Sequence, residues 1–338
     1  MEGSTHTKEF GEILKENLWE YEKQYRLSYK QRQVVNNIMT CRTREQGGHI
    51  LVCGECGETQ VVYNPCKDRH CPNCGAFEKA QWLEEQKVWM LPIGYYHVVF
   101  TIDHGLNEIV WLNQKQMYGL LFGVVAKLLK EYGKEYLGGE VGFTMVLHTW
   151  GQVMQDHPHL HVIYTGGALE QMGKGAYRWR SSGETFLFPV VKLSADFRAA
   201  YCEEVRKLKR KGKLVEKKRV GKELVDLEIE KRLEAAESKD WEVYIKKPRE
   251  GNENLVEYLG KYVFRTAMSN HRIVSYGQGE VEFTYYDNRD EGKQKVMKLS
   301  GVEFLRRFLQ HVLPPRFHRV RHYGLHHSSQ RKKLGIAR

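Results

Sequence analysis

The chain has 338 residues, of which 41% are hydrophobic, so it is long enough for one catalytic domain of ordinary size and a small additional module. Its 53 Lys and Arg residues outnumber its 42 Asp and Glu residues, which gives a net charge of +11 and makes nucleic acid the expected partner. We expect no secretory signal and no membrane span, because no apolar run approaches about 18 residues. In the reducing cytoplasm that this implies, clustered cysteines favour metal binding over disulfides.

A charged, helical-looking lead-in, residues 1–40, precedes a cysteine-rich segment, residues 41–76. Six of the seven cysteines lie in this segment, and four of them form two Cys-x-x-Cys knuckles separated by fourteen residues. A knuckle places two thiolates on one tight turn, and two knuckles can complete the tetrahedral shell of a zinc ion. The residues expected to hold one structural zinc are Cys53, Cys56, Cys71 and Cys74.

Four further potential zinc ligands lie beside the knuckles: Cys41, His49, Cys66 and His70. Eight ligands would fill two tetrahedral shells, so these four either hold a second zinc or are packing residues beside a single ion. Closed four-ligand sites stabilise folding and leave no position for a substrate. The module is therefore expected to be structural, and catalysis is expected elsewhere in the chain.

After the module, the hydrophobic pattern alternates between helical and strand-like stretches. A connecting helix over residues 77–94 leads into a larger domain, residues 95–312, with a charged helical insertion at about 195–240 and a basic C-terminal tail, residues 313–338. Mixed helices and strands favour an α+β fold with a mainly antiparallel central sheet flanked by helices. Further helices are expected over 106–136, 253–269 and 301–312, and strands over 95–102, 141–150, 159–165, 241–245, 281–286 and 294–299.

Three histidines occur at a spacing of two, His157, His159 and His161, and the last two lie on the expected strand 159–165. Alternate residues of a strand share a face, so His159 and His161 are expected to point the same way and to form half of a metal site. An antiparallel neighbour would bring His148 opposite His161 as the third ligand. Gln152 and His157 are the competing candidates for that third position.

The expected helix over 253–269 carries Tyr258 and Tyr262, whose separation of four places both phenols on one helix face. Tyrosines at this spacing are also common at the edge of a helix core, so the pattern alone does not establish a nucleophile. Lys261, between them, is either a phosphate contact or a solvated lysine. Further candidate DNA contacts lie in the basic tail, which has no acidic residue after Glu303; they are Arg319, Arg321 and Tyr323.

The order of these motifs resembles the two-tyrosine HUH transposases of bacterial rolling-circle insertion sequences, with their N-terminal transposase zinc-binding domain. The resemblance extends from about Cys41 to Gly324 and includes His159-Leu-His161, Tyr258-Leu-Gly-Lys-Tyr262 and Arg321-His-Tyr-Gly324. No motif of this kind matches the charged insertion.

The resemblance implies an HUH-type catalytic domain and a bacterial, DNA-associated enzyme in the cytoplasm. It implies that a Mg²⁺ or Mn²⁺ ion, held by His159, His161 and a third ligand, assists attack by tyrosine on single-stranded DNA of the transposon ends and target. Cleavage would leave a 5′-phosphotyrosine and a free 3′-hydroxyl, which can rejoin strands without a nucleotide cofactor. Which of Tyr258 and Tyr262 acts first is left open, as is the oligomeric state.

Two other functions fit parts of the pattern. A replication initiator or a conjugative relaxase would use the same HUH chemistry, although the position of the zinc module favours a transposase. A non-catalytic zinc-ribbon DNA-binding regulator would carry the histidines and tyrosines as structural residues and would not nick DNA.

Overall fold

The computed structural model describes residues 9–173, 175–183, 187–220, 223–249, 260, 262–330, 332–333 and 335. The contacts of the chain divide it into two compact units. The first unit consists of Met1–Ala80, Trp150–Gln155 and Phe264–Pro315, and the second of Gln81–Thr149, Asp156–Val263 and Arg316–Arg338. Among the described residues, none of the helices is both long and apolar enough to cross a membrane.

The first unit packs two N-terminal helices and helix α9 with a three-stranded antiparallel sheet of order β11-β12-β13. Its core contains the ring of Phe10, which lies 5.5 Å from Phe304 and 4.5 Å from Phe308, centroid to centroid. Ser28 begins the second helix with a capping box, in which its hydroxyl accepts a hydrogen bond from the Gln31 amide. The elements are α1 (Phe10–Gln24), α2 (Tyr29–Thr40), β1 (Gly48–Val52), β2 (Thr59–Tyr63), β11 (Ile273–Gly277), β12 (Glu280–Asp287), β13 (Lys293–Ser300) and α9 (Gly301–Leu309).

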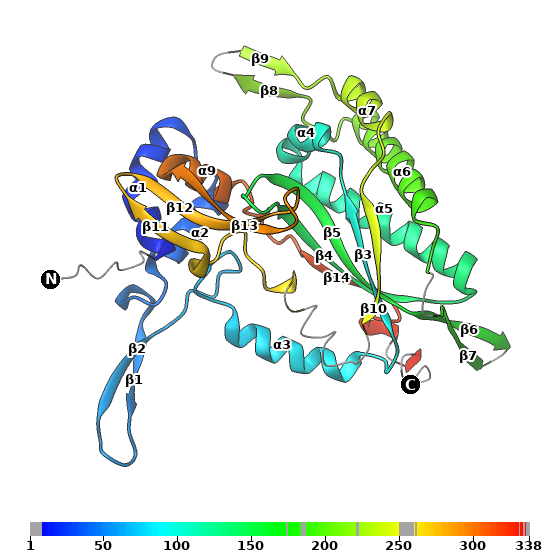
Figure 1. Ribbon diagram of the computed structural model, residues 1–338, viewed down its shortest axis with the longest axis horizontal. Coiled ribbons are helices and arrows are strands. Elements are labelled where there is room, and N and C mark those ends of the chain that lie inside the picture. The colour runs from blue at the N-terminus through cyan, green and yellow to red at the C-terminus, as the bar shows by residue number, and fades with distance from the viewer. Residues whose placement is uncertain are drawn as a thin grey trace. The chain divides into compact units, whose positions relative to one another are not determined.

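The second unit is built on a five-stranded sheet of order β10-β3-β5-β4-β14, in which β10–β3, β3–β5 and β4–β14 are antiparallel pairs (Figure 1). The expectation of an α+β fold with a mainly antiparallel sheet is confirmed. Helix α3 (Ala76–Trp89), the expected connecting helix, carries the chain from the first unit into the second. The other elements are β3 (Tyr95–Thr101), α4 (Asn107–Leu112), α5 (Gln114–Tyr132), β4 (Gly142–Trp150), β5 (Asp156–Thr165), β6 (Gly167–Gly173), β7 (Ala176–Ser181), α6 (Val190–Arg210), β8 (Lys217–Val220), β9 (Glu223–Asp226), α7 (Ile229–Glu237), β10 (Val243–Arg249) and β14 (Val320–Gly324).

Helices α5 and α6 cover one face of this sheet. The Tyr164 hydroxyl on β5 donates a 3.0 Å hydrogen bond to the Leu129 carbonyl on α5, and the ring of Phe100 on β3 lies 5.2 Å from Phe197 on α6. Because side chains alternate along a strand, the odd-numbered residues of β5 point to the opposite face. That opposite face carries the histidines of the candidate site.

The structure differs from the sequence prediction in the charged insertion, 195–240, which is not helical throughout. It consists of α6, the β8–β9 hairpin and α7. Its helices are not merely solvated, because Phe197 and Tyr201 are fully buried and Arg206 pairs at 2.7 Å with both Glu230 and Glu237. These contacts join α6 to α7 and give the charged segment a structural role.

The C-terminal segment also differs from the expected basic tail, because Val320–Gly324 forms edge strand β14 of the central sheet. The predicted helix 253–269 lies largely outside the described residues. The chain is helical at Val263 and irregular from Arg265 to Ser269, where Ala267 and Met268 are buried in the core of the first unit, so the predicted helix is too long at its C-terminal end. Residues 264–315 share the contacts of the first unit, whereas the sequence analysis places them in one domain with residues 95–263.

Candidate metal sites and tyrosine

A cluster of three buried histidines lies on the face of the central sheet opposite helices α5 and α6. His148 comes from β4, and His159 and His161 come from alternate positions of β5. One possible ligand atom from each of the three lies within 4.8 Å of the other two. The side chains are only 2%, 9% and 8% exposed, respectively, so the sheet holds them in fixed directions. Strand pairing therefore assembles the three-histidine set that the sequence favours.

In His159 and His148, a hydrogen bond at one ring nitrogen determines which nitrogen keeps the lone pair that can bind a metal. His159 Nδ1 lies 2.6 Å from the His157 carbonyl and must donate to it, so the lone pair of His159 is on Nε2. His148 Nε2 lies 2.7 Å from the Tyr262 carbonyl and donates in the same way, which places its lone pair on Nδ1. The Nε2 atoms of His159 and His161 are 3.1 Å apart and face each other.

His97 on β3 is a further member of the site that the sequence analysis does not single out. Its Nε2 lies 2.9 Å from His161 Nδ1, and the two rings are stacked with centroids 5.1 Å apart. A metal ion on His161 Nε2 requires a proton on Nδ1, which His97 Nε2 can accept as a hydrogen bond. Position 97 is two residues from Val99, which pairs with His161, so it shares the face of the histidine cluster, and that alternation was the available signal.

Tyr262 is the tyrosine that the described residues bring to the cluster. Its ring centroid lies 4.0 Å from that of His161, 5.1 Å from His97 and 5.9 Å from His148. Tyr258 and Lys261 lie outside the described residues.

The alternatives to His148 do not join the set, although the ring of His157 lies 4.8 Å from that of His159. The ring of His157 stacks on His104 at 5.1 Å, and its burial and the neighbouring His104 lower its pKa to about 4. Gln152 belongs by its contacts to the first unit. Among the described residues, the only histidine set of metal-binding geometry is His148, His159 and His161.

The three imidazoles fit a divalent cation of intermediate softness. Neutral imidazole suits first-row transition metals better than Mg²⁺, which prefers oxygen ligands, so this donor set suits Mn²⁺ with the remaining positions taken by water or phosphate oxygens. Such an ion would supply charge stabilisation at a bound phosphate.

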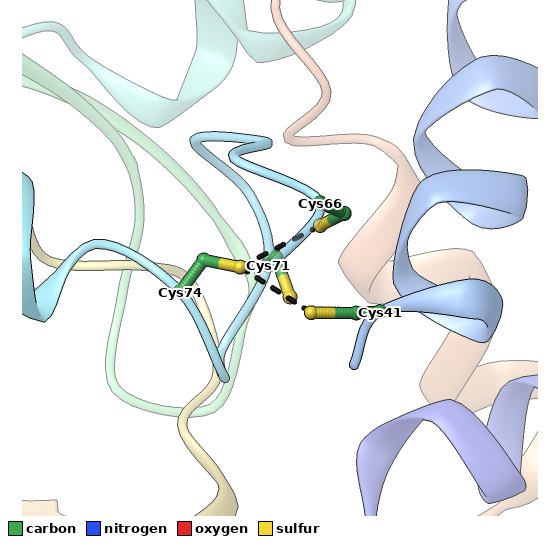
Figure 2. Close-up of side chains that lie close together, drawn as sticks. All are labelled: Cys41, Cys66, Cys71 and Cys74. Carbon is green, nitrogen blue, oxygen red and sulfur yellow. Dashed lines mark hydrogen bonds between the residues drawn. The ribbon is translucent and has the colours of Figure 1, made fainter. Parts of the chain in front are cut away.

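A second cluster, in the first unit, consists of four cysteines: Cys41, Cys66, Cys71 and Cys74 (Figure 2). The Sγ atom of Cys74 lies 3.3 Å from that of Cys41 and 3.6 Å from that of Cys66. A tetrahedral zinc ion with Zn–S bonds of about 2.3 Å separates its sulfur ligands by about 3.8 Å, so the four sulfurs fit a zinc shell with small adjustment.

Local structure explains how the four cysteines meet. Cys41 ends α2, where its amide donates to the Ile38 carbonyl, and the loop of Cys71 is fastened to α2 by a 3.0 Å hydrogen bond from Asn37 to Asp68. Hydrogen bonding with the Cys71 thiol lowers the pKa of Cys66 to about 6, whereas burial raises the pKa of Cys74 to about 12. A thiolate, the form that binds zinc, is thus most favoured at Cys66.

The predicted zinc shell needs a correction, because the first knuckle does not join the second. Cys53 and Cys56 are exposed on the turn between β1 and β2, and the four-sulfur set takes Cys41 and Cys66 in their place. The spacing resembles that of a zinc ribbon, but the first knuckle lies at the turn of the β1–β2 hairpin, which projects from the helices of the first unit (Figure 1).

The two predicted histidine ligands do not complete a second shell among the described residues. His49 is exposed on β1, opposite Val62. His70 uses Nδ1 for a 2.8 Å contact with Asp68 and Nε2 to accept a hydrogen bond from the Leu313 amide at 3.3 Å. Both nitrogens of His70 therefore serve the fold.

The predicted DNA contacts at the C-terminal end lie on or beside β14. Arg319 donates a hydrogen bond to the Val263 carbonyl, one residue after Tyr262. The Arg321 guanidinium lies over the rings of Phe122 and Phe317, and the Lys130 amine lies 5.6 Å from the ring centre of Tyr323. Arg321 and Tyr323 both line a pocket of about 870 Å³, whereas Arg319 does not.

Comparison with known proteins places this geometry in a family. A family model described as "Putative transposase" (Y2_Tnp) matches residues 142–333, and one described as "Transposase zinc-binding domain" matches residues 13–102. The chain is 40% identical over 304 residues to the "Putative transposase y4qJ" of Sinorhizobium fredii, which covers 88% of this chain and 75% of the relative. It is 26% identical over 307 residues to the "Transposase for insertion sequence element IS801" of Pseudomonas savastanoi pv. phaseolicola, which covers 86% of this chain and 69% of that relative. The first model spans more than half of the chain, and the protein therefore belongs to the Y2_Tnp transposase family and carries a transposase zinc-binding domain.

Proposed function

We propose that this transposase is an HUH single-strand DNA endonuclease and strand transferase that uses tyrosine as its nucleophile. The observation that carries the proposal is the position of Tyr262, whose ring lies 4.0 Å from that of His161 in a cluster of three histidines suited to a divalent cation. A tyrosine beside a metal site can attack a phosphate that the metal binds. The substrates would be the single-stranded ends of the mobile element and its target DNA.

The cleavage step exchanges one phosphodiester for another. The phenol oxygen of Tyr262 or Tyr258 forms a bond to the scissile phosphorus, the bond from phosphorus to the 3′ oxygen breaks, and the phenol proton ends on the new 3′-hydroxyl. The product is a 5′-phosphotyrosine that keeps the bond energy, so a later 3′-hydroxyl can reverse the step without ATP. A pair of tyrosines would allow one to hold the first cut strand while the other attacks a second site.

The residues of the site have separate parts in this proposal. His148, His159 and His161 bind the cation, and His97 orients His161. A free phenol has a pKa of about 10 and is a weak nucleophile at neutral pH, and a cation held by the three histidines would supply positive charge that favours its attack. The related proteins are named transposases, which favours transposition over replication initiation or conjugative relaxation for the same chemistry.

The test is formation of a covalent protein–DNA adduct. Purified protein is incubated with Mn²⁺ or Mg²⁺ and end-labelled single strands from the flanks of its own gene, beside Tyr258→Phe, Tyr262→Phe and the double variant. We expect an adduct that survives denaturant and is lost in the double variant. Absence of an adduct on every flank, while the same DNAs are bound, would favour a non-catalytic DNA-binding regulator.

A further inference from the structure

A pocket of about 870 Å³ lies on the second unit, around strand β14. Its size is within the range of about 300–1,000 Å³ for pockets that hold small organic groups. Its lining includes Thr144, Arg321, His322, Tyr323 and His326, and the Arg321-His-Tyr sequence is a motif to which the proposed cleavage chemistry assigns no role.

The pocket wraps around edge strand β14. Its part beside Thr144 and His322 shares a face of the central sheet with the histidine cluster, whereas Arg321 and Tyr323 point to the other face, toward α5. His148 and Thr144 are four residues apart on β4, so both point to the same side, and Thr144 is paired with His322 across β4 and β14. Ile163, which also lines the pocket, is two residues from His161 on β5 and shares its side. At about 3.4 Å per residue, the pocket begins about 14 Å from His148 along the strand.

Hydrogen bonds within the pocket determine what His322 offers to a ligand. The single hydroxyl of Thr144 lies 2.9 Å from His322 Nδ1 and 3.1 Å from His326 Nδ1. A hydroxyl has one proton, so it donates to one imidazole and accepts from the other. Burial lowers the pKa of His326 to about 3 and also lowers that of His322, so both rings are neutral at pH 7.

The second ring nitrogen of His326 decides between the two arrangements. Its Nε2 is buried with no hydrogen-bond partner among the described residues, and an orphaned N–H is rarer in proteins than an orphaned acceptor. His326 therefore carries its proton on Nδ1 and donates to Thr144, and the Thr144 hydroxyl donates to His322 Nδ1. The proton of His322 is then on Nε2, which becomes a hydrogen-bond donor.

The pocket also carries two cationic side chains, Arg321 and Lys130, and one carboxylate, Glu85. The Arg321 guanidinium is positioned by its stacking on Phe122, 4.1 Å from the ring centre, and Lys130 lies over Tyr323. Donors and cations call for a ligand rich in acceptor oxygens, such as a phosphate or the acceptor edge of a base. The half-buried ring of Tyr323 adds an aromatic surface.

We propose that this pocket binds one unpaired nucleotide of the DNA strand that is cleaved at the histidine cluster, with its base contacted by His322 on the histidine face and its phosphate held by Arg321 and Lys130 around the edge of β14. The inference rests on the proposed function for the identity of the strand. A stacked strand advances about 3.4 Å per nucleotide, so the bound nucleotide lies within about four positions of the cleaved bond. The pocket would then select which phosphodiester reaches Tyr262.

The test is an abasic scan of binding, with no added divalent cation so that cleavage does not intervene. Each base of a flank oligonucleotide is removed in turn, and the dissociation constant is measured by fluorescence anisotropy for the wild type, His322→Ala and Thr144→Val. Loss of a base contact of this kind weakens binding about tenfold. We expect one abasic position to weaken binding of the wild type about tenfold. The same position should not weaken binding of His322→Ala.

Two controls make the result specific. His271→Ala removes an exposed histidine from the first unit and should leave the scan unchanged. Thr144→Val keeps the shape of the side chain but removes the hydroxyl that fixes the His322 proton. It should therefore reduce the loss of affinity caused by the same abasic position, without unfolding the protein.

If the dissociation constants depend on the abasic position in the same way in the wild type and in both pocket variants, the inference is overturned. Because the scan measures binding, its outcome is independent of adduct formation. An adduct with an unchanged scan refutes only the pocket, whereas a position-specific effect without an adduct supports the pocket and refutes the cleavage.

Discussion

His97 Nε2 lies 2.9 Å from His161 Nδ1, so a residue of β3 controls the protonation and direction of a candidate metal ligand on β5. Partners of this kind fix the tautomer of a ligating histidine and typically change metal affinity by about 10–100-fold when they are removed. The relationship links a position outside the three-histidine motif to the chemistry proposed for it.

We expect His97→Leu to raise the Mn²⁺ concentration needed for half-maximal adduct formation by about tenfold or more, because Nδ1 of His161 loses its acceptor. The maximal rate at saturating Mn²⁺ should fall much less. His97→Gln is the matched variant, since its amide oxygen can accept the same hydrogen bond and should restore part of the affinity. Equal metal dependence in wild type and His97→Leu would contradict the positioning role.

The cysteine cluster predicts a zinc content of about one ion per chain, held by Cys41, Cys66, Cys71 and Cys74. Cys66→Ser should lose this zinc and lower the melting temperature, because binding energy at a closed site is folding energy. Cys53→Ser is the control, since Cys53 is exposed on the β1–β2 turn. Elemental analysis of both variants decides the matter, and zinc loss in Cys53→Ser would restore the knuckle pairing expected from the sequence.

Glu303 makes the free energy of unfolding depend on pH in the acidic range. Hydrogen bonds from Arg306 and Arg307 lower its pKa to about 2, below the usual value near 4.3, so its contribution is complete above about pH 4.5 and is lost as the pH falls toward 2. Its side chain is 31% exposed, and solvent screening reduces the contribution to about 1–2 kcal/mol. Glu303→Gln should flatten the fall in unfolding free energy between pH 4.5 and 2.5 in urea titrations. An unchanged pH profile would show that the arginine contacts contribute nothing.

Gly324 ends β14 with a φ of +55°, and a Cβ added there would lie 1.8 Å from the Val141 carbonyl oxygen. Gly324→Ala should therefore cost more than the strain of a left-handed residue, which is about 1 kcal/mol. Gly212→Ala separates the two effects, because Gly212 has a φ of +61° but no atom within 4 Å of the added Cβ. Urea unfolding of both variants should show the larger loss for Gly324→Ala, and equal losses would mean that the strand edge adapts.

Strand alternation was sufficient to place His159 and His161 on one face, and the neighbouring strand β4 brings His148 to them, while their binding of a metal stays a prediction. The sequence was not sufficient for the zinc shell. The spacing of cysteines indicates which of them share a turn. Tertiary structure decides which other cysteines complete the zinc shell, here through the contact of α2 with the loop of Asp68. The hairpin β8–β9 and strand β14 were missed for the same reason, because a charged or basic sequence can form a strand when its neighbours supply the pairing.

The division of the chain has a consequence for its folding. The chain passes between the two units within three residues of His148, His159 and Tyr262, at Thr149/Trp150, Gln155/Asp156 and Val263/Phe264. Neither unit is a continuous stretch of sequence, so neither can be cut out as a fragment. Residues 294 positions apart, Phe10 and Phe304, must meet before the first unit is complete. Such non-local closure slows folding, so that a truncated product would carry the histidines without a complete first unit.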